Sequence, residues 1–331
     1  MSRAESAVRG AASGTPRMAY VALDPQAPLP PEALLAVSFG PGSTRTDPRH
    51  LHIGLPALRG GEWSELWCAR GPVACGREGP LRYAADGEHL AGIIEVDERA
   101  HEGLAAAAEA AYACISRFQH QSGYRHLLRM WNYFDAINRG AGDEERYKQF
   151  CMGRAAGLAP GAGEQLPAAT AIGRRDGSAL LTIYWLAGRE AGLALENPRQ
   201  LSAYRYPRRY GPAAPRFSRA MLIAGSKLMI SGTASIVGHA SRHCGDLRAQ
   251  LTETVENLTS LQQRALVAAP ALAPRLGDSS LVKIYLRDAT ALEELTTLCA
   301  ALLPAVPTIV LEADICRSEL LLEIDCVHGA A

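Results

Sequence analysis

The segment from Ser231 onward constrains the fold of this chain most. A Ser-Gly-Thr-Ala-Ser turn at 231–235 leads into a helix, strand, helix, strand, strand pattern that ends in Leu-Leu-Leu-Glu-Ile-Asp at 320–325. The final run places one carboxylate, Glu323, inside an otherwise apolar strand. Burial raises the pKa of a carboxyl group, and an acid that keeps its proton near neutrality can act as a general acid. The alternative is a glutamate at a strand edge that faces solvent.

The remaining pattern predicts strands and helices in blocks. Short strands broken by Gly and Pro are expected between residues 18 and 96. Hydrophobic periodicity predicts helices at 100–122, 143–155, 246–268 and 289–303. Further strands are expected at 125–135, 169–172, 179–187, 193–195, 218–230, 280–286, 308–314 and 319–328. Because these elements do not alternate strictly, we predict an α+β fold with a disordered N-terminus at 1–17, an N-terminal domain at 18–215 and a C-terminal domain at 216–331.

Composition argues against several classes of protein. At 331 residues the chain is long enough for one large or two medium domains. Basic and acidic residues are equal, at 34 each, so no global charge attracts nucleic acid or an anionic membrane. No apolar run approaches the roughly 18 residues of a membrane span, and the start of the chain lacks the apolar core of a signal peptide. We therefore expect a cytoplasmic protein.

The eight cysteines form no C-x-x-C pair and have no metal-ligand spacing with histidine. We expect reduced thiols, no metal site and no organic cofactor. The sequence also has no dinucleotide-binding, P-loop or serine-hydrolase motif in the structural context that each one requires.

Within the C-terminal third, several motifs resemble the Rid/YjgF superfamily. They are Ile-Ser-Gly-Thr-Ala at 230–234, Ala-Gln at 249–250, Glu-Asn-Leu at 256–258, Val-Lys-Ile-Tyr-Leu-Arg-Asp at 282–288 and Leu-Glu-Ile-Asp at 322–325. The resemblance implies a mixed sheet packed against helices, with Glu323 at the position of the superfamily's glutamate. That superfamily carries a carboxylate-binding arginine 15 positions earlier, where this chain has Thr308. An imine hydrolase of the Rid type would need another anchor here.

The chain from about Met18 resembles a narrower family, the chorismatases. The motifs that carry this resemblance are Trp-Asn-Tyr at 131–133, Glu-Arg-Tyr-Lys-Gln-Phe-Cys-Met-Gly-Arg at 145–154, Tyr-Pro-Arg-Arg-Tyr-Gly-Pro at 206–212, Phe-Ser-Arg-Ala at 217–220, Ser-Gly-Thr-Ala-Ser at 231–235 and Gly-His at 238–239. It implies chorismate as the substrate, with contacts from Tyr147, Arg154, Tyr206 and Arg219. Chorismate is a dianion, and arginine forks suit two carboxylates.

The resemblance also implies the catalytic residues. Glu323 would protonate the enolpyruvyl methylene, which releases pyruvate. Aromatising members pair a small loop residue, here Gly232, with a cysteine seven positions before the glutamate, here Cys316. Gly232 would leave room for the ring to tilt, and Cys316 would steer the rearrangement to 3-hydroxybenzoate, with or without 4-hydroxybenzoate. The alternative for Cys316 is a buried apolar side chain, and Ser231 and Thr233 either bind substrate oxygens or form the turn.

Three other functions stay open from the sequence. They are a Rid-type enamine or imine hydrolase, a chorismatase that gives a dihydroxycyclohexadiene carboxylate, and a metabolite sensor without catalysis. The oligomeric state is also open between a monomer and a homotrimer, because Rid folds favour trimers while a second domain can take the place of the neighbours.

Overall fold

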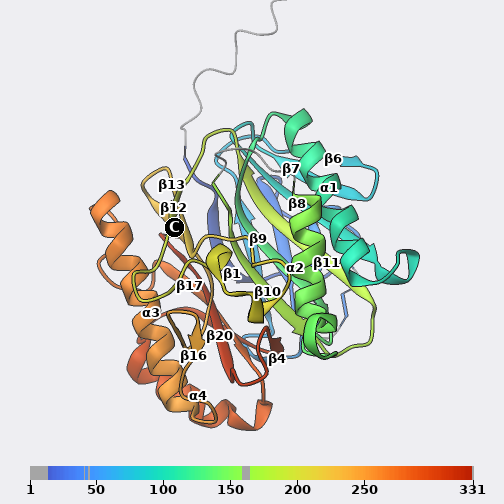
Figure 1. Cartoon of the computed structure of the whole chain (residues 1–331). Helices are drawn as coiled ribbons and strands as arrows, with labels where there is room; N and C mark the ends of the chain where they lie inside the picture. The colour runs from blue at the N-terminus through green and yellow to red at the C-terminus, as the bar shows by residue number, and fades with distance from the viewer. Residues whose placement is uncertain (1–13, 41, 44, 159–164, 330–331) are drawn as a thin grey trace, which may run out of the picture.

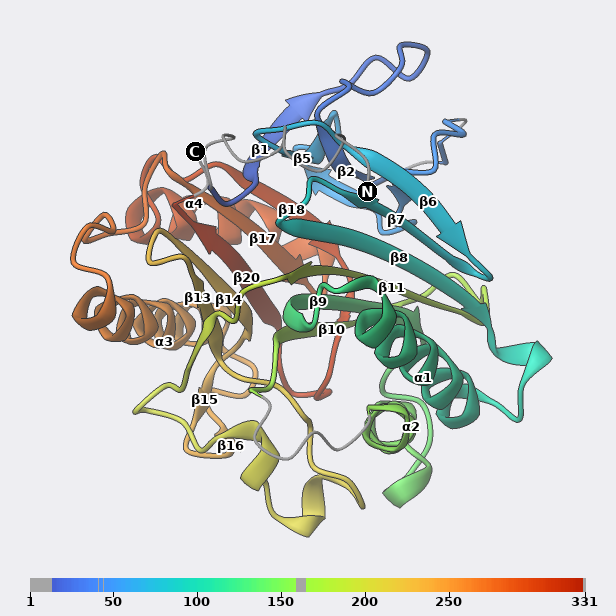
Figure 2. The same ribbon diagram turned by 90° about the horizontal axis from the view of Figure 1, so that it is seen from above.

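Two seven-stranded sheets face each other at the centre of the molecule, and two helices cover the outer face of each sheet (Figures 1 and 2). This computed structural model describes residues 14–40, 42–43, 45–158 and 165–329. The expected disordered N-terminus lies mainly outside the described residues, and Arg17 begins the first strand.

The first large sheet has the order β19-β10-β9-β11-β8-β7-β6. Helix α1 (Leu104–Ser122) and helix α2 (Arg146–Gly157) lie against its outer face. Its strands are β6 (Ala74–Glu78), β7 (Leu81–Ala85), β8 (His89–Asp97), β9 (His126–Asp135), β10 (Ala168–Arg174), β11 (Leu180–Gly188) and β19 (Asp314–Ile315).

The second large sheet has the order β12-β13-β14-β20-β17-β18-β4 and is mixed, since β17 pairs with β18 in parallel and with β20 antiparallel. Helix α3 (Leu247–Ala268) and helix α4 (Leu292–Leu302) cover it. Its strands are β4 (Ala57–Arg59), β12 (Leu193–Leu195), β13 (Ala220–Ile223), β14 (Lys227–Thr233), β17 (Ser280–Leu286), β18 (Thr308–Glu312) and β20 (Leu322–His328).

Two smaller sheets complete the structure. A four-stranded sheet of order β1-β5-β2-β3 packs on the core between the large sheets and includes Trp67 in that core. Its strands are β1 (Arg17–Ala22), β2 (Ala33–Ser38), β3 (His50–His52) and β5 (Trp63–Cys68), and a two-stranded hairpin joins β15 (Ile236–Val237) to β16 (Ala240–Ser241).

Strand alternation decides which side chains meet between the large sheets. On β20, Leu322, Ile324 and Cys326 belong to the core under α3 and α4, whereas Val327 belongs to the core between the sheets. Because side chains alternate along a strand, Glu323 and Asp325 share the face of Val327. The same rule puts Arg129, Trp131 and Tyr133 of β9 on the side that faces β20, as the hydrogen bond from Trp131 Nε1 to Asp325 Oδ2 (3.0 Å) confirms.

The predicted α+β class is confirmed, and so are the long helices and most of the strands. Three predictions of detail were wrong. The segment 218–230 is a hairpin of β13 and β14, whose turn places Ala224 and Gly225 at positive φ. Residues 231–233 continue β14, so the Ser-Gly-Thr-Ala-Ser segment begins as strand. Strands β4, β6 and β7 were not predicted, because β6 is mostly exposed and lacks an apolar face, and β4 has only three residues.

The predicted domain boundary at residue 215 stays a prediction, and sheet pairing crosses it in both directions. Strand β4 and strand β12, from the first part of the chain, pair with β18 and β13 of the second sheet. In return, β19 pairs with β10 of the first sheet. The two large sheets are therefore linked by exchanged strands as well as by a shared core.

Candidate active site

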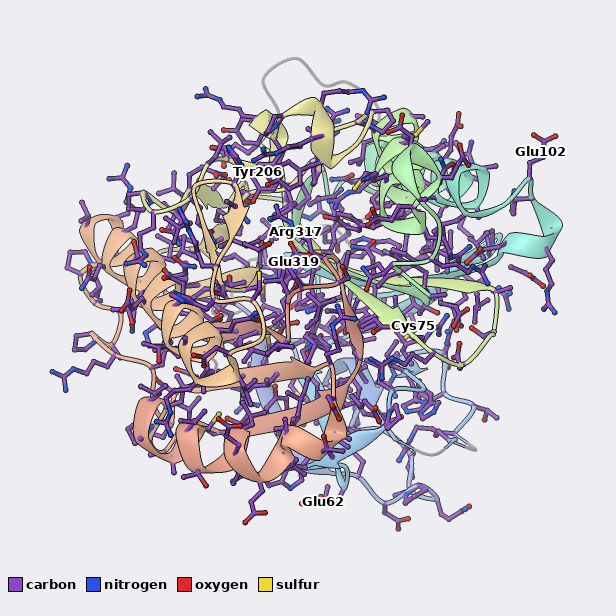
Figure 3. All side chains as sticks on the ribbon, turned by 60° about the horizontal axis from the view of Figure 1, so that its bottom comes forward. Glu62, Cys75, Glu102, Tyr206, Arg317 and Glu319 are labelled. Carbon is purple, nitrogen blue, oxygen red and sulfur yellow. The ribbon has the colours of Figure 1, made fainter. Side chains whose placement is uncertain are left out.

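A cavity of about 370 Å³ contains all seven site residues predicted from the sequence. The residues come from α2, from the segment between β12 and β13, from β14, from the turn after β19 and from β20. Figure 3 shows Tyr206, Arg317 and Glu319 gathered in this region, whereas Glu62 and Glu102 lie at the periphery. The seven are Tyr147, Arg154, Tyr206, Arg219, Gly232, Cys316 and Glu323.

Glu323 combines burial with access to the cavity. Its exposed fraction is 5%, and burial, together with the nearby Asp325, raises the pKa of the Glu323 carboxyl to about 8. The positive charges of Arg129, Arg219 and Arg317 oppose this shift but do not cancel it. At neutral pH most of Glu323 is therefore the protonated acid, as the sequence predicts for a general acid.

The strand around Glu323 is more polar than the sequence analysis expected. Asp325, two residues later, is also buried and lies on the same face. The interpretation of one carboxylate in an otherwise apolar strand was therefore wrong, because this face of β20 meets hydrogen-bond donors from β9 and β17.

Gly232 leaves its space to the Glu323 carboxyl. A Cβ atom on Gly232 would lie 1.9 Å from Glu323 Oε1 and 3.3 Å from Thr170 Cγ2. The backbone N–H of Gly232 donates to Thr170 Oγ1 at 3.0 Å, which fixes the strand at this point. The room that we attributed to a tilting ring is thus occupied by the acid itself in this structure.

Arg154 and Arg219 are buried cations that face the cavity, with exposed fractions of 3% and 4%. The Nε and Nη2 atoms of Arg154 and the Nε atom of Arg219 are buried and have no hydrogen-bond partner among the described residues. Within the described part of the chain, neither guanidinium forms an ion pair with a carboxylate. A buried charge without a partner is costly, so these two side chains are suited to an anionic ligand.

The phenols help to hold this arrangement. Tyr206 accepts a hydrogen bond from Arg219 Nη2 at 2.7 Å, and Leu201 O accepts another from the same nitrogen. Tyr147, Cys151 and Arg154 follow one another at helical spacing on α2 and line the cavity together. Burial raises the pKa of the Tyr147 phenol, so it enters the cavity as a neutral donor.

Cys316 lines the cavity next to Arg317. Burial and the neighbouring Glu323 raise the pKa of the Cys316 thiol well above its ordinary value. The side chain is therefore a neutral thiol, which is neither a nucleophile nor a base at neutral pH. Its contacts with apolar neighbours include the small cluster around Ile315 and Leu320.

Sequence reasoning missed several cavity residues. Arg317 donates to His239 O (2.9 Å) and Ser241 Oγ (3.0 Å), and its guanidinium lies 4.3 Å from the Tyr210 ring centroid. Arg209 and Tyr210 belong to the motif quoted at 206–212, but the motif alone did not show that they line the cavity. The position of Arg317 directly after Cys316 was the available signal.

Ser231 and Thr233 support the backbone. Ser231 Oγ donates to Ser218 O at 2.6 Å and accepts from the Ala169 N–H at 2.8 Å. Thr233 Oγ1 donates to Ser231 O at 2.8 Å. Both hydroxyl hydrogens are used in these bonds and both side chains are buried, which favours the structural alternative over substrate binding.

No group of three or more His, Cys, Asp and Glu side chains among the described residues is arranged to hold a metal ion. None of the helices in the described ranges is both long and apolar enough to cross a membrane. Thr308, at the position of the Rid arginine, bonds to Val306 O and is not among the described residues that line the cavity.

Comparisons with known proteins identify the family of this chain. Residues 65–187 match the family described as Chorismatase FkbO/Hyg5-like, N-terminal. The chain is 36% identical to a 3-hydroxybenzoate synthase of Streptomyces hygroscopicus over 293 residues, which cover 84% of each protein. It is also 36% identical to a chorismatase of Streptomyces rapamycinicus, over 80% of this chain and 82% of that protein.

Structural comparison extends the similarity to nearly the whole chain. A crystal structure of a chorismatase aligns with 96% of this chain and 99% of its own, at a TM-score of 0.83 and 29% identity. The YjgF gene product of E. coli aligns with 41% of the chain at a TM-score of 0.29 and 15% identity. The sequence identity over most of both proteins and the shared fold show that this chain belongs to the chorismatase family.

Proposed function

We propose that this protein converts chorismate into 3-hydroxybenzoate, with or without 4-hydroxybenzoate, and pyruvate. The observation that carries the proposal is a protonated, buried Glu323 in one cavity with two buried arginines that have no acidic partner among the described residues. Chorismate supplies what this cavity lacks, because it has two carboxylates and an acid-sensitive vinyl ether. The similarity to a 3-hydroxybenzoate synthase supports the product.

The charges of the cavity favour a dianion. Its described lining includes five cationic side chains (Lys148, Arg154, Arg209, Arg219 and Arg317) and three acidic ones (Glu145, Glu319 and Glu323). Lys148 is paired with Glu145 at 3.1 Å, and Glu323 is mostly neutral near pH 7. A dianionic substrate would therefore meet an excess of positive charge, with Arg154 and Arg219 as carboxylate anchors.

The proposed chemistry begins with proton transfer from Glu323 to the terminal methylene of the enolpyruvyl group. Positive charge then develops at the ether carbon, and the new Glu323 carboxylate stabilises it electrostatically. The bond between the ether oxygen and ring carbon C3 breaks, and pyruvate leaves with that oxygen. For 3-hydroxybenzoate the C4 hydroxyl oxygen then moves to C3, whereas 4-hydroxybenzoate forms when it stays on C4. In both cases the ring loses a proton as it becomes aromatic, which balances the proton that was donated. Hydroxybenzoate and pyruvate together contain all the atoms of chorismate, whereas formation of a dihydroxycyclohexadiene carboxylate consumes one water molecule.

The alternatives have less support. A Rid-type hydrolase would need its carboxylate-binding arginine at position 308, where this chain has Thr308. Thr308 also does not line the described cavity. A sensor would need the arginines but no buried acid. The dihydroxycyclohexadiene product differs only in the fate of the ring, so the product assay must separate it from hydroxybenzoate.

The test is incubation of the purified protein with chorismate, with pyruvate and the ring products measured by chromatography. We expect equal amounts of pyruvate and hydroxybenzoate. Arg154→Ala and Arg219→Ala should each lower kcat/KM by about 10-fold or more, since a charge-assisted hydrogen bond contributes roughly 1.5–3 kcal/mol. Lys148→Ala is the matched control, because this cavity cation already has an acidic partner. Absence of pyruvate, or equal effects of all three variants, would contradict the proposal.

A further inference from the structure

Beneath Glu323, between the two large sheets, lies a buried cluster of two cations and two carboxylates that the proposed reaction does not use. Lys283 Nζ lies 2.7 Å from Glu65 Oε2 and 3.7 Å from Asp325 Oδ1, and Arg129 Nη2 lies 3.7 Å from Asp325 Oδ2. The exposed fraction of each of the four residues is 3% or less. The formal charges of this cluster sum to zero.

Both carboxylates are held by neutral donors as well as by cations. Asp325 Oδ2 accepts from Trp131 Nε1 at 3.0 Å and from the Tyr285 hydroxyl at 2.9 Å. Glu65 Oε1 accepts from Trp67 Nε1 at 2.6 Å. The two carboxylates are therefore held in fixed positions, because their neutral donors lie on three different packed strands, β5, β9 and β17.

Arg129 connects this cluster to the catalytic acid. Its exposed fraction is 0%, and Nη2 donates to Thr170 Oγ1 at 2.5 Å. Thr170 Oγ1 in turn accepts the N–H of Gly232, the residue against which the Glu323 carboxyl lies. The guanidinium is thus close enough to Glu323 to stabilise a carboxylate there, and its charge does lower the pKa of Glu323.

Asp325 has the opposite effect to Arg129 on the pKa of Glu323. It shares the face of β20 with Glu323, it pairs with Arg129, and its negative charge raises the pKa of Glu323. Without Asp325, the buried Arg129 cation would have Glu323 as an available counter-ion. We propose that Asp325 is a positioning residue that engages Arg129 and thereby keeps Glu323 in its protonated, catalytically competent form.

Other charged and titratable groups also face Glu323 and must be considered. They come from the segment before β13, the turn after β19, and α2, and they are Arg219, Arg317, Cys316 and Tyr147. The two arginines favour the carboxylate, while Tyr147 and Cys316 have raised pKa values and are neutral. Glu319 lines the same cavity, but Asp325 is the neighbouring anion that raises the pKa of Glu323 most, and its charge opposes three arginines that lower it.

The test measures protonation of Glu323 directly, without substrate. For each variant, the infrared spectrum is compared with that of the same variant carrying Glu323→Gln in addition. The difference isolates the carbonyl stretch of the protonated Glu323 carboxyl, whose intensity is then measured as a function of pH. In the otherwise unchanged protein we expect a midpoint of about 8. Asp325→Asn should lower the midpoint by about 1–3 pH units, the usual effect of a neighbouring charge.

Two further variants separate this role from general damage. Arg129→Gln should move the midpoint upward, and Asp325→Asn combined with Arg129→Gln should return it towards about 8, because no charge is then left unpaired. Glu65→Gln, which removes the more distant carboxylate of the same cluster, should have a smaller effect than Asp325→Asn. If Asp325→Asn alone does not fold, the comparison of Arg129→Gln with the double variant still measures the effect of Asp325.

An unchanged midpoint in Asp325→Asn, or an equal shift in Glu65→Gln, would overturn the inference. The inference rests on the proposed role of Glu323 as an acid, but the two fail in different ways. If the protein does not release pyruvate from chorismate while the midpoints shift as expected, the proposed function is wrong and the control of protonation stands. If chorismate is consumed while the midpoints do not move, the inference alone is wrong. In an active enzyme, the upper limb of the pH–rate profile should shift with the infrared midpoint.

Discussion

At Glu323 the burial that favours proton donation also destabilises the folded protein at neutral pH. The pKa of this carboxyl rises from an ordinary value of 4.5 to about 8 on folding. The folded state therefore holds the proton more tightly than the unfolded state. The contribution of this proton to the free energy of unfolding is fully present below pH 4.5, and it is lost progressively as the pH rises towards 8.

Glu323→Gln should accordingly change stability and activity in opposite directions. Glutamine does not titrate, so the variant should become more stable than the unmodified protein as the pH rises from 4.5 to 8, by up to about 1.4 kcal/mol per pH unit. Pyruvate release should fall by about 10²- to 10⁴-fold. Urea unfolding at several pH values, together with a pyruvate assay, checks both effects. A constant stability difference across this pH range would mean that Glu323 is ionised in the folded protein.

Cys316 is the residue to which we attribute control of the product. Cys316→Ala should shift the product from hydroxybenzoate towards the dihydroxycyclohexadiene carboxylate, while pyruvate still forms because Glu323 is retained. Cys151→Ala is the control, since this buried thiol lines the same cavity on α2. Either change should cost on the order of 1 kcal/mol of stability through its cavity. The measurement is the ratio of each ring product to pyruvate, and an unaltered ratio in Cys316→Ala would leave this side chain with a packing role.

At the scale of the element, the end of β14 determines where the acid lies. The pairing of β14 with β20 shifts register between Ile230 and Thr233, and Gly232 lies within this irregularity. Its missing Cβ gives the Glu323 carboxyl its place. The atom that an added methyl group would meet is the end of a flexible side chain, so the carboxyl would move and the strand would remain.

Gly232→Ala should therefore leave the fold intact and slow the release of pyruvate. This differs from the effect expected if the glycine only makes room for the ring, in which case the product ratio would change at an unaltered rate of pyruvate release. Gly277→Ala is a suitable control, because a methyl group there meets no described atom within 4 Å. Pyruvate release at the rate of the unmodified protein would show that the displaced acid still reaches its substrate.

Helix α2 shows how much of the site a sequence can predict. The sequence predicts a helix at 143–155, and α2 is found at Arg146–Gly157, where Tyr147 and Arg154 line the cavity together. What fixes the face that α2 presents to the cavity is the contact with α1, where a Cβ on Gly153 would lie 2.0 Å from Ala105 O and a Cβ on Gly157 would lie 2.4 Å from Glu109 O. No periodicity in the sequence indicates such a close contact between two helix backbones.

At the scale of the whole molecule, the residues least predictable from sequence are those whose partners come from distant strands. Glu323 was recognised from its local pattern and from family motifs. The partners of Asp325 were not, since Trp131 lies 194 positions away along the chain and the pair Lys283–Glu65 is separated by 218 positions. A buried lysine or aspartate in an apolar strand signals a polar network, but the sequence does not identify its members.

The shared core between the large sheets leads to a prediction about fragments. A fragment of residues 216–331 lacks β4 and β12 and exposes the face that carries Met221, Met229 and Tyr285. We expect it to aggregate or to unfold without cooperativity when it is produced alone. Production together with residues 18–215 should restore soluble material. A monomeric fragment with a cooperative thermal transition would instead support two independent domains and the boundary at 215.

The exchange of β4 and β19 between the sheets has a consequence for the order of folding. Strand β18 pairs with β4, which lies near the start of the chain, and β10 pairs with β19, which lies close to its end. Contacts between such remote segments require closure of long loops, which slows folding. The raised pKa of Glu323, our proposed acid, depends on burial between the sheets, so we expect it to develop only after these closures. The appearance of enzymatic turnover during refolding should therefore report completion of the native topology, later than any signal from helices alone.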